Sequence, residues 1–321
     1  MIRSFVFSDG KLVSQDLATE ALRLVHADKG LVLWVDLDNP TDEEIKTVLE
    51  GVFAFHPLAI EDCVTPSSLP KIEDYEDYLF MVIHAVDFTR TDKFATTELD
   101  IFLGKEFVVT FHRDALRSVS TTLDRVAKST ARGPDRLAHT LLDQLIDNYL
   151  PVMEELRAEL EELEEGVLAR DSGQQKLVTE LLTVRADFSR LRAIVRPQRD
   201  VIDRLARGDS RFIRAQLLPY FRDLRDNLAR LEETTVSYND RLMMAFDIYL
   251  NKAAFEANEG IKFLTALTAV TLPAVMVGGW YGMNFEHMPE LRSPHGYLWA
   301  ACLTLVSTAL MVIYLRKKRW F

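Results

Sequence analysis

Two long stretches without a charged residue stand near the C-terminus of this 321-residue chain. Residues 263–281 and 297–315 are each 19 residues long and contain no Asp, Glu, Lys or Arg. As α-helices they would each be roughly 28 Å long, which matches the hydrocarbon layer of a bilayer. A pair of buried core helices is the alternative, but core helices of this length normally keep a polar face. The sequence therefore predicts two transmembrane helices.

The charges beside these two spans predict their orientation. Four consecutive basic residues, 316–319, follow the second span, while the connector holds only Arg292 against Glu286 and Glu290. The positive-inside rule places the basic tail in the cytoplasm. Because two spans return the chain to the side from which it entered, the large N-terminal part is expected to be cytoplasmic as well.

The N-terminal part of the chain is strongly acidic. The net charge is −11 overall, and residues 1–260 hold 32 basic against 47 acidic residues. Such a surface favours cations and lacks the basic footprint that nucleic acid requires, so no nucleic-acid partner is expected. The two cysteines, Cys63 and Cys302, are too few for a disulfide framework or a cysteine zinc cluster. The first residues lack the long apolar run of a signal peptide.

Local patterns predict an α+β domain that is followed by long helices. Strands are expected over 30–37 and 78–86 and in a hairpin of 99–103 with 107–111, and Thr41 to Glu44 is a helix capping box. Helical patterns then cover 114–129, 135–169, 174–207 and 210–257. The expected parts are a cytoplasmic α/β domain (1–130), long helices including a stalk (131–260), a first transmembrane helix (261–281), an extracytoplasmic loop (282–296), a second transmembrane helix (297–315) and a basic tail (316–321).

The last of these helical patterns has the spacing of a coiled-coil seam. Its core positions alternate in steps of four and three, at Leu217, Phe221, Leu224, Leu228, Leu231, Thr235, Tyr238, Leu242, Ala245 and Tyr249. Since no stop signal precedes residue 263, one helix of roughly 70 residues, about 100 Å long, would continue into the first span. One such helix beside a single further span encloses no pore. An aqueous path would need several copies around an axis, which favours a ring-shaped homo-oligomer.

The first span carries small and polar residues in a regular order. Thr265, Thr268 and Thr271 are three residues apart, and Gly278 and Gly279 follow. Ordinary helix packing explains such residues, because glycine allows close approach and threonine bonds back to the backbone. Pore lining is the other reading, and the span alone does not decide between them.

The end of the first span reads Gly282-Met283-Asn284, and the connector then contains Met288-Pro289-Glu290-Leu291. In these motifs, and in the order of α/β domain, stalk and two spans, the chain resembles the CorA family of magnesium/cobalt transport proteins. The resemblance implies a funnel-shaped homopentamer in the plasma (inner) membrane, with the first span lining the pore. It also implies uptake of Mg²⁺ driven by the membrane potential, with Co²⁺ and Ni²⁺ as further ions.

The same resemblance assigns the residues of the conduction path. Gly282, Met283 and Asn284 are expected to form the selectivity ring. Mg²⁺ dehydrates reluctantly, so five Asn284 amides would contact its water shell rather than strip it. The pore face aligned from this motif consists of Asn258, Ile261, Leu264, Thr268, Leu272, Val275 and Gly279. Of these, Ile261, Leu264 and Leu272 would form apolar rings that gate by dewetting, with plain packing as the alternative role.

The resemblance also implies roles for acidic residues at both ends of the conduction path, in attracting cations and in feedback by Mg²⁺. Glu286 and Glu290 would attract cations outside the membrane, or solvate the connector and pair with Arg292. In the family, Mg²⁺ bound between neighbouring cytoplasmic domains closes the channel. Asp223 matches the stalk carboxylate of that site, and Asp87 is our choice for its partner in the neighbouring copy. The alternative for Asp223 is an exposed helix position paired with Arg222 or Arg225.

Two other functions remain open at this stage. ZntB-like zinc transporters share the topology and the Gly-Met-Asn triplet, and His287 and His295 are possible zinc ligands; the Met-Pro-Glu-Leu connector favours the magnesium branch. A membrane-tethered coiled-coil scaffold or sensor without transport belongs to a different class. The sequence has no Gly-rich phosphate loop, His-Glu-x-x-His or Gly-x-Ser-x-Gly motif, so no enzymatic activity is expected.

Overall fold

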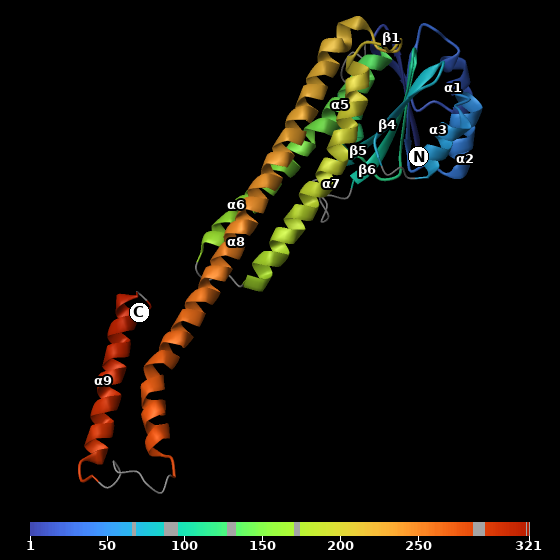
Figure 1. The fold of residues 1–321 in the computed structure, drawn as a ribbon. Coiled ribbons are helices and arrows are strands. Elements are labelled where there is room, and N and C mark those ends of the chain that lie inside the picture. The colour runs from blue at the N-terminus through green and yellow to red at the C-terminus, as the bar shows by residue number, and fades with distance from the viewer. Residues whose placement is uncertain are drawn as a thin grey trace. The chain divides into compact units, whose positions relative to one another are not determined.

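The computed structural model describes residues 1–65, 69–86, 96–126, 133–169, 174–284, 293–318 and 320 (Figure 1). The chain divides into two compact units, Met1–Ala245 and Phe246–Phe321. The first holds a mixed sheet with helices on both of its faces, and the second holds the apolar helices near the C-terminus. The predicted order of parts along the chain is confirmed: an α+β domain, then long helices, then two apolar C-terminal helices.

The sheet has seven strands in the order β2-β1-β3-β7-β6-β5-β4. β3 and β7 are parallel, and the other neighbouring pairs are antiparallel. The predicted hairpin is β6–β7, in which Leu103 pairs with Val108. Gly104 begins its turn, and the ring of Phe107 leaves no room there for a side chain. The strands are β1 Ile2–Ser8, β2 Lys11–Gln15, β3 Val32–Asp38, β4 Lys71–Asp74, β5 Tyr78–Val86, β6 Thr96–Gly104 and β7 Phe107–His112.

Four short helical segments cover one face of the sheet: α1 Thr19–His26, α2 Asp42–Ile45, the π-helix η1 Lys46–Val52 and α3 Pro57–Val64 (Figure 1). The capping box predicted at Thr41 is present, because its hydroxyl accepts from the Glu44 N–H while the Glu44 carboxylate accepts from the Thr41 N–H. Stacked aromatic rings fill the space beneath, with Phe55 4.0 Å from Phe102 and 5.2 Å from Phe53 between ring centroids. This apolar core fixes the sheet.

Longer helices follow: α4 Arg117–Val126, α5 Pro134–Asp147, α6 Tyr149–Leu168, α7 Gln174–Ala206, α8 Leu218–Tyr281 and α9 Gly296–Lys317. The short 3-10 helix η2, Ala215–Leu217, directly precedes α8. The single helix expected over 135–169 is two helices, separated at Asn148. α5 packs on β3, β5, β6 and β7, whereas α6 packs on α7. Tyr149, at the start of α6, donates its hydroxyl to the carbonyl of His84 at 2.7 Å and so fixes the junction to β5.

The stalk and the first span form one helix, as predicted. α8 is 64 residues long. The coiled-coil seam is buried from Leu217 to Ala245, with Phe221, Leu224 and Leu228 fully inaccessible and only Tyr238 half-buried. Apolar side chains repeated every 3.5 residues therefore secure α8 within the N-terminal unit.

Candidate functional site

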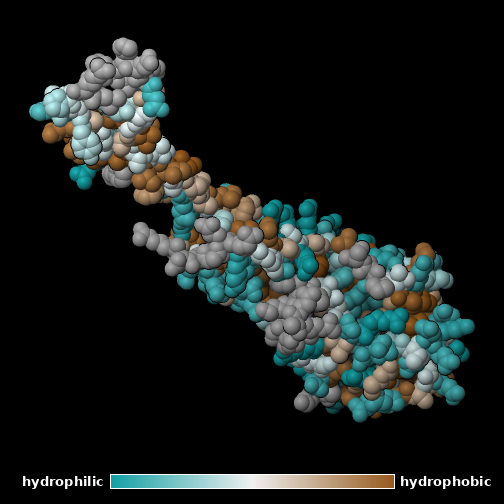
Figure 2. Space-filling model, turned by 90° about the horizontal axis from the view of Figure 1, so that it is seen from below, coloured by the Kyte–Doolittle hydropathy of each residue, from teal (hydrophilic) through white to brown (hydrophobic). Residues whose placement is uncertain are grey.

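The last part of α8 and most of α9 are apolar and exposed. Both helices are long and apolar enough to cross a membrane, and only 6% of the most apolar window of each is buried. Brown, apolar surface accordingly gathers on the C-terminal unit in Figure 2, whereas the N-terminal unit is mainly teal on the face shown. Core helices would be buried, so this exposure contradicts that alternative. A bilayer covers such a surface.

One face of α8 in this unit is less exposed than the rest. Ala266 is fully buried, and Ala269, Val270, Pro273 and Val277 are half-buried. These positions recur at three and four residues and so form one stripe. α9 is drawn alongside this part of α8 in Figure 1, and Leu315 near its end is also buried. The stripe is therefore the contact face within the unit.

The residues predicted to line a pore lie on the opposite side of the helix. At about 100° per residue, their mean direction is roughly 150° from that of the buried stripe. Each of them is exposed in the single chain: Asn258, Ile261, Leu264, Thr268, Leu272, Val275 and Gly279. This face is free to meet lipid or another copy, and its pore-lining role stays a prediction.

The threonines of the span bond back to the helix, as the packing alternative expects. Thr265 donates to the carbonyl of Ile261 at 2.8 Å, Thr268 to that of Leu264 at 2.9 Å, and Thr271 to that of Thr268 at 3.1 Å. Each hydroxyl hydrogen is used, but the oxygen lone pairs remain available. Thr268, which belongs to the predicted pore face, thus presents only acceptor capacity to a cation or its water shell.

The Gly-Met-Asn triplet follows directly on the end of α8. The Gly282 N–H donates to the Gly278 carbonyl at 2.9 Å, and the Met283 N–H donates to the Trp280 carbonyl at 3.3 Å. A Cβ at residue 282 would lie 3.0 Å from the Gly278 carbonyl oxygen, so glycine is the residue that fits without displacement. Asn284 comes next, and its exposed amide has no hydrogen-bond partner among the described residues. The carbonyl end of a helix favours cations beside it.

Several predicted site residues cannot be placed. Glu286, Glu290 and Asp87 lie outside the described residues, as does His287. His295 is exposed and occupies the cap position before α9. Within the described parts of the chain, no second acidic group lies beside Asp223 to complete a metal site. Among the described residues, no three His, Cys, Asp or Glu side chains are arranged to hold a metal ion.

Asp223 is exposed on α8 between the buried seam residues Phe221 and Leu224. The pairing suggested as its alternative role is not found. Arg225 instead contacts Asp226 at 2.8 Å and Asp203 at 3.8 Å, and no ion pair of Asp223 occurs among the described residues. Asp223 does act on His139, whose pKa is lowered chiefly by burial while nearby carboxylates, Asp223 included, oppose that effect. Its carboxylate is available to an external cation.

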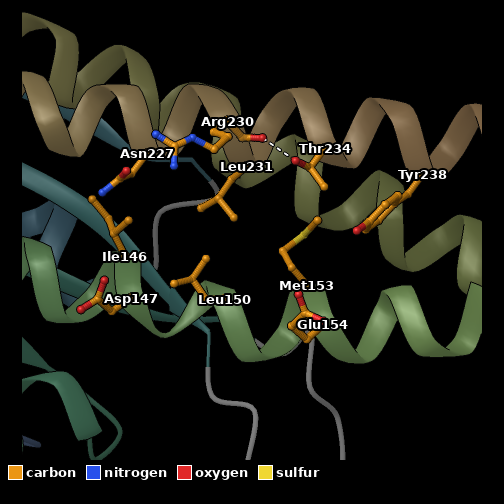
Figure 3. Close-up of a pocket in the computed structure, with 10 residues that line it drawn as sticks. All are labelled: Ile146, Asp147, Leu150, Met153, Glu154, Asn227, Arg230, Leu231, Thr234 and Tyr238. Atoms are coloured by element: carbon orange, nitrogen blue, oxygen red, sulfur yellow. Dashed lines mark hydrogen bonds between the residues drawn. The ribbon is translucent and has the colours of Figure 1, made fainter.

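A groove of about 490 Å³ begins one helical turn beyond Asp223 (Figure 3). Leu150, Met153 and Leu231 supply apolar walls between α6 and α8, and Asp147 and Arg230 stand at its margin. Burial and the neighbouring Asp143 raise the pKa of Asp147. The remaining lining residues are Ile146, Glu154, Asn227, Thr234 and Tyr238. Since residues 223, 227, 230 and 234 share a helix face, the groove and Asp223 open in the same direction.

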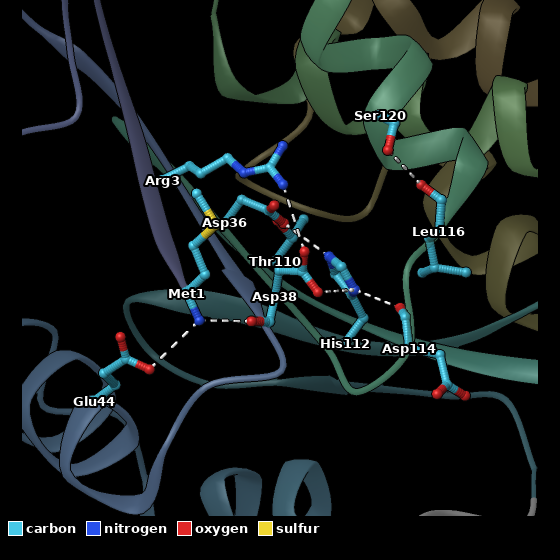
Figure 4. Close-up of polar contacts among 10 residues, drawn as sticks. All are labelled: Met1, Arg3, Asp36, Asp38, Glu44, Thr110, His112, Asp114, Leu116 and Ser120. Carbon is cyan, nitrogen blue, oxygen red and sulfur yellow. Dashed lines mark hydrogen bonds and ion pairs between the residues drawn. The ribbon is translucent and has the colours of Figure 1, made fainter.

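Buried charged residues at the ends of the strands were not predicted from the sequence. His112 and Asp36 are 3% and 1% exposed, and Thr110 donates to Oδ1 of Asp36 at 2.6 Å (Figure 4). Burial acts to lower the pKa of His112, but Asp36, the Asp114 carbonyl and Asp38 outweigh it and raise the pKa. Acidic residues at alternate positions of an otherwise apolar strand, Asp36 and Asp38, are the signal that could have indicated this network.

A second buried acid lies on β6. Burial first, and then the charge of Glu98, raise the pKa of Asp100 well above its ordinary value. Burial likewise raises the pKa of the neighbouring Cys63 thiol. Both line a cavity of about 330 Å³ together with His84, Thr96, Thr97, Glu98, Phe111, His112, Arg113 and Asp114. These groups come from β5, β6, β7, α3 and the segment after β7, all within the N-terminal unit, and none of them was predicted to line the conduction path.

Comparison with known proteins agrees with this arrangement. Residues 29–317 match the model of the family described as CorA-like Mg²⁺ transporter protein. The protein YfjQ of Bacillus subtilis is 33% identical over 291 residues, which cover 90% of this chain and 89% of that protein. The cobalt/magnesium transport protein CorA of Thermotoga maritima is 28% identical over 298 residues, covering 91% and 84%.

The fold is similarly matched over its whole length. The structure of the CorA magnesium transporter from Methanocaldococcus jannaschii superposes with a TM-score of 0.82 at 21% identity, covering 99% of this chain and 98% of that one. Together with the family match over the sheet, the stalk and both apolar helices, this likeness identifies the class of protein. The chain belongs to the family of CorA-like Mg²⁺ transporter proteins, which are membrane transporters of divalent metal ions.

Proposed function

We propose that this protein is a homopentameric Mg²⁺ channel of the plasma (inner) membrane, with both termini in the cytoplasm. The observation that carries the proposal is the position of Gly282, Met283 and Asn284. They follow immediately on an exposed apolar helix whose one protected face is turned to α9. The names of relatives in Thermotoga maritima and Methanocaldococcus jannaschii, which specify cobalt and magnesium transport, support the choice of ion.

The chemistry of Mg²⁺ explains why an asparagine ring suits this task. Mg²⁺ holds an octahedral water shell tightly, so rapid passage requires contact with the shell and not its removal. Asn284 supplies a neutral amide oxygen that accepts from such waters without binding the ion too strongly to release it. Because Gly282 has no side chain, the backbone beside Asn284 could approach the hydrated ion closely. Five copies would surround the ion symmetrically at the outer mouth.

The pore below this ring is proposed to be closed by apolar side chains. Ile261 and Leu264 are each 63% exposed and Leu272 is 47% exposed in the single chain, on the face turned away from the buried stripe. Arranged in rings, they would exclude water and so block a hydrated ion. Asn258 lies on the same face below them and is the polar candidate at the cytoplasmic end.

Feedback is proposed to act through the stalk. Asp223 of one copy and an acidic residue of the neighbouring copy, for which Asp87 is our choice, would repel each other until Mg²⁺ bridges them. The exposed carboxylate of Asp223 and the groove on the same helix face support a contact at this level. Rising internal Mg²⁺ would then favour the closed ring by mass action. Influx through the open pore would be driven by the membrane potential, with Co²⁺ and Ni²⁺ as further permeant ions.

Ion flux into liposomes that contain the purified protein tests the function. An inside-negative potential set with potassium and valinomycin should accelerate Mg²⁺ entry relative to protein-free vesicles. Parallel measurements with Co²⁺, Ni²⁺ and Zn²⁺ give the order of permeation. Zn²⁺ flux without Mg²⁺ flux would instead assign a ZntB-like zinc transporter. Absence of flux for all four ions would favour the tethered scaffold or sensor.

A further inference from the structure

Three basic residues at the end of α9 are exposed, and the described part of the chain offers them no ion-pair partner. Arg316, Lys317 and Lys318 follow Leu315, the last apolar residue of the helix, and all three are exposed. No ion pair involves any of them within the described part of the chain. Three adjacent cations without a counter-ion repel one another, so an anionic partner would stabilise this segment.

Backbone hydrogen bonds at the carbonyl end of α9 keep these three basic residues close to the end of the helix. The Lys318 N–H donates to the Tyr314 carbonyl at 3.1 Å, and the Trp320 N–H donates to the Leu315 carbonyl at 3.0 Å. The chain therefore folds around the carbonyl end of α9 and does not leave it in an extended form. Tyr314 and Trp320 are 57% and 39% exposed, and rings with one polar end prefer the water boundary of a bilayer. The charges thus lie where lipid headgroups begin.

One acidic residue of α8 in the same C-terminal unit is already paired. Glu259 already binds Lys262 at 2.6 Å, so that pair contributes no net charge. The long aliphatic stems of Lys317 and Lys318 can remain beside acyl chains while their ammonium groups reach the headgroup phosphates. Such juxtamembrane clusters attract anionic lipids with about 1 kcal/mol per basic residue.

We propose that Arg316, Lys317 and Lys318 form a docking surface for the headgroups of anionic phospholipids in the cytoplasmic leaflet. The surface requires α9 to span the membrane, but it is independent of ion conduction. Its occupant is a lipid and not a soluble anion, because Tyr314 and Trp320 place the cluster against the acyl boundary.

Retention of lipid by the full-length protein tests this proposal. Protein in mild detergent is titrated with phosphatidylglycerol or with phosphatidylcholine, and bound lipid is counted by native mass spectrometry. The wild type should bind phosphatidylglycerol in clear preference. The double variant Lys317→Gln/Lys318→Gln should weaken that binding by about 25-fold, from roughly 1 kcal/mol for each lost charge.

Matched variants separate charge from folding. Lys317→Arg/Lys318→Arg should bind phosphatidylglycerol like the wild type, and Lys11→Gln/Lys29→Gln in the N-terminal unit should do the same. Equal affinity of the wild type for the two lipids would overturn the proposal. So would undiminished binding by the glutamine variant, or displacement of the lipid by equimolar inorganic phosphate. Because the readout is bound lipid, a failure here leaves the flux experiment unaffected, and the reverse also holds.

Discussion

His112 and Asp36 form a buried ion pair at the adjoining ends of β7 and β3, with Nε2 of the imidazole 3.3 Å from Oδ1 of the carboxylate. Nδ1 lies 2.7 Å from the Asp114 carbonyl oxygen. A neutral imidazole has one N–H, whereas here both nitrogens face oxygen acceptors. The protonated ring donates from Nδ1 to the Asp114 carbonyl and places its charge beside Asp36, although Nε2 makes no hydrogen bond within the described residues. The pair therefore ties the sheet to the segment that leads into α4.

This pair is expected to stabilise the N-terminal unit more in mild acid than at higher pH. The folded pKa of His112 is raised above its ordinary value, so its contribution is complete below pH 6.5. It is lost as the pH rises through the folded pKa. In thermal unfolding of the full-length protein in detergent, the difference in midpoint between the wild type and His112→Gln should be smaller at pH 8 than at pH 6.

The variant His112→Gln isolates this effect. It leaves Asp36 buried without a countercharge, at a cost of about 3–5 kcal/mol, and should flatten the profile between pH 6 and 8. The raised pKa of Asp100 also stabilises the fold in acid, whereas burial lowers the pKa values of His26, His84 and His139 and so stabilises the fold at higher pH. These groups persist in the variant, so their effects cancel in the comparison with the wild type. An advantage of the wild type over the variant that is equal at pH 6 and pH 8 would contradict the pair.

The seam of α8 predicts a large loss of stability when one of its leucines is truncated. Leu224 is fully buried, so Leu224→Ala should lower the free energy of unfolding by about 2–5 kcal/mol. Leu182→Ala on α7 is the matched control, because Leu182 is 53% exposed and its loss leaves no cavity. Chemical denaturation followed by tryptophan fluorescence measures both. Similar losses in the two variants would argue against a packed seam.

Parts of this fold follow from local sequence and others do not. The β5 strand, the Thr41 capping box and the α8 seam depend on residues close in the chain, and each was found where predicted. The interruption at Asn148 and the His112–Asp36 pair were missed, because they depend on contacts with strands more than 60 residues away. Which face of α8 lines the pore stays a prediction. A face that contacts other copies in an oligomer is exposed in a single chain, as is a face that contacts lipid.

The proposed gate predicts which leucine of the span faces the pore. Leu272→Asn should hydrate the constriction and raise the basal ion leak in proteoliposomes, because a polar ring does not dewet. Leu267→Asn is the control, since Leu267 is also exposed and lies about 140° away around the helix. Leak in the Leu267 variant but not in the Leu272 variant would show that the pore face is rotated from the aligned one.

The proposed feedback site predicts magnesium-dependent protection that requires Asp223. Bound Mg²⁺ should protect the wild type from proteolysis, with a stabilisation of roughly 2.7 kcal/mol at a hundredfold excess over Kd. Asp223→Asn should still conduct but lose much of this protection. Asp226→Asn is its control, because that carboxylate is engaged with Arg225 at 2.8 Å. Equal protection in the Asp223 variant and the wild type would place sensing elsewhere.

The most direct test of the account is Mg²⁺ uptake by proteoliposomes that contain Asn284→Ala. Loss of the amide that contacts the water shell should reduce uptake about tenfold or more, from the ~1–1.5 kcal/mol of each lost hydrogen bond, while the oligomer stays intact. Asn251→Ala, on an exposed position of α8 in the stalk, should conduct like the wild type. Wild-type uptake by an assembled Asn284→Ala protein would contradict the claim that this residue forms the selectivity ring.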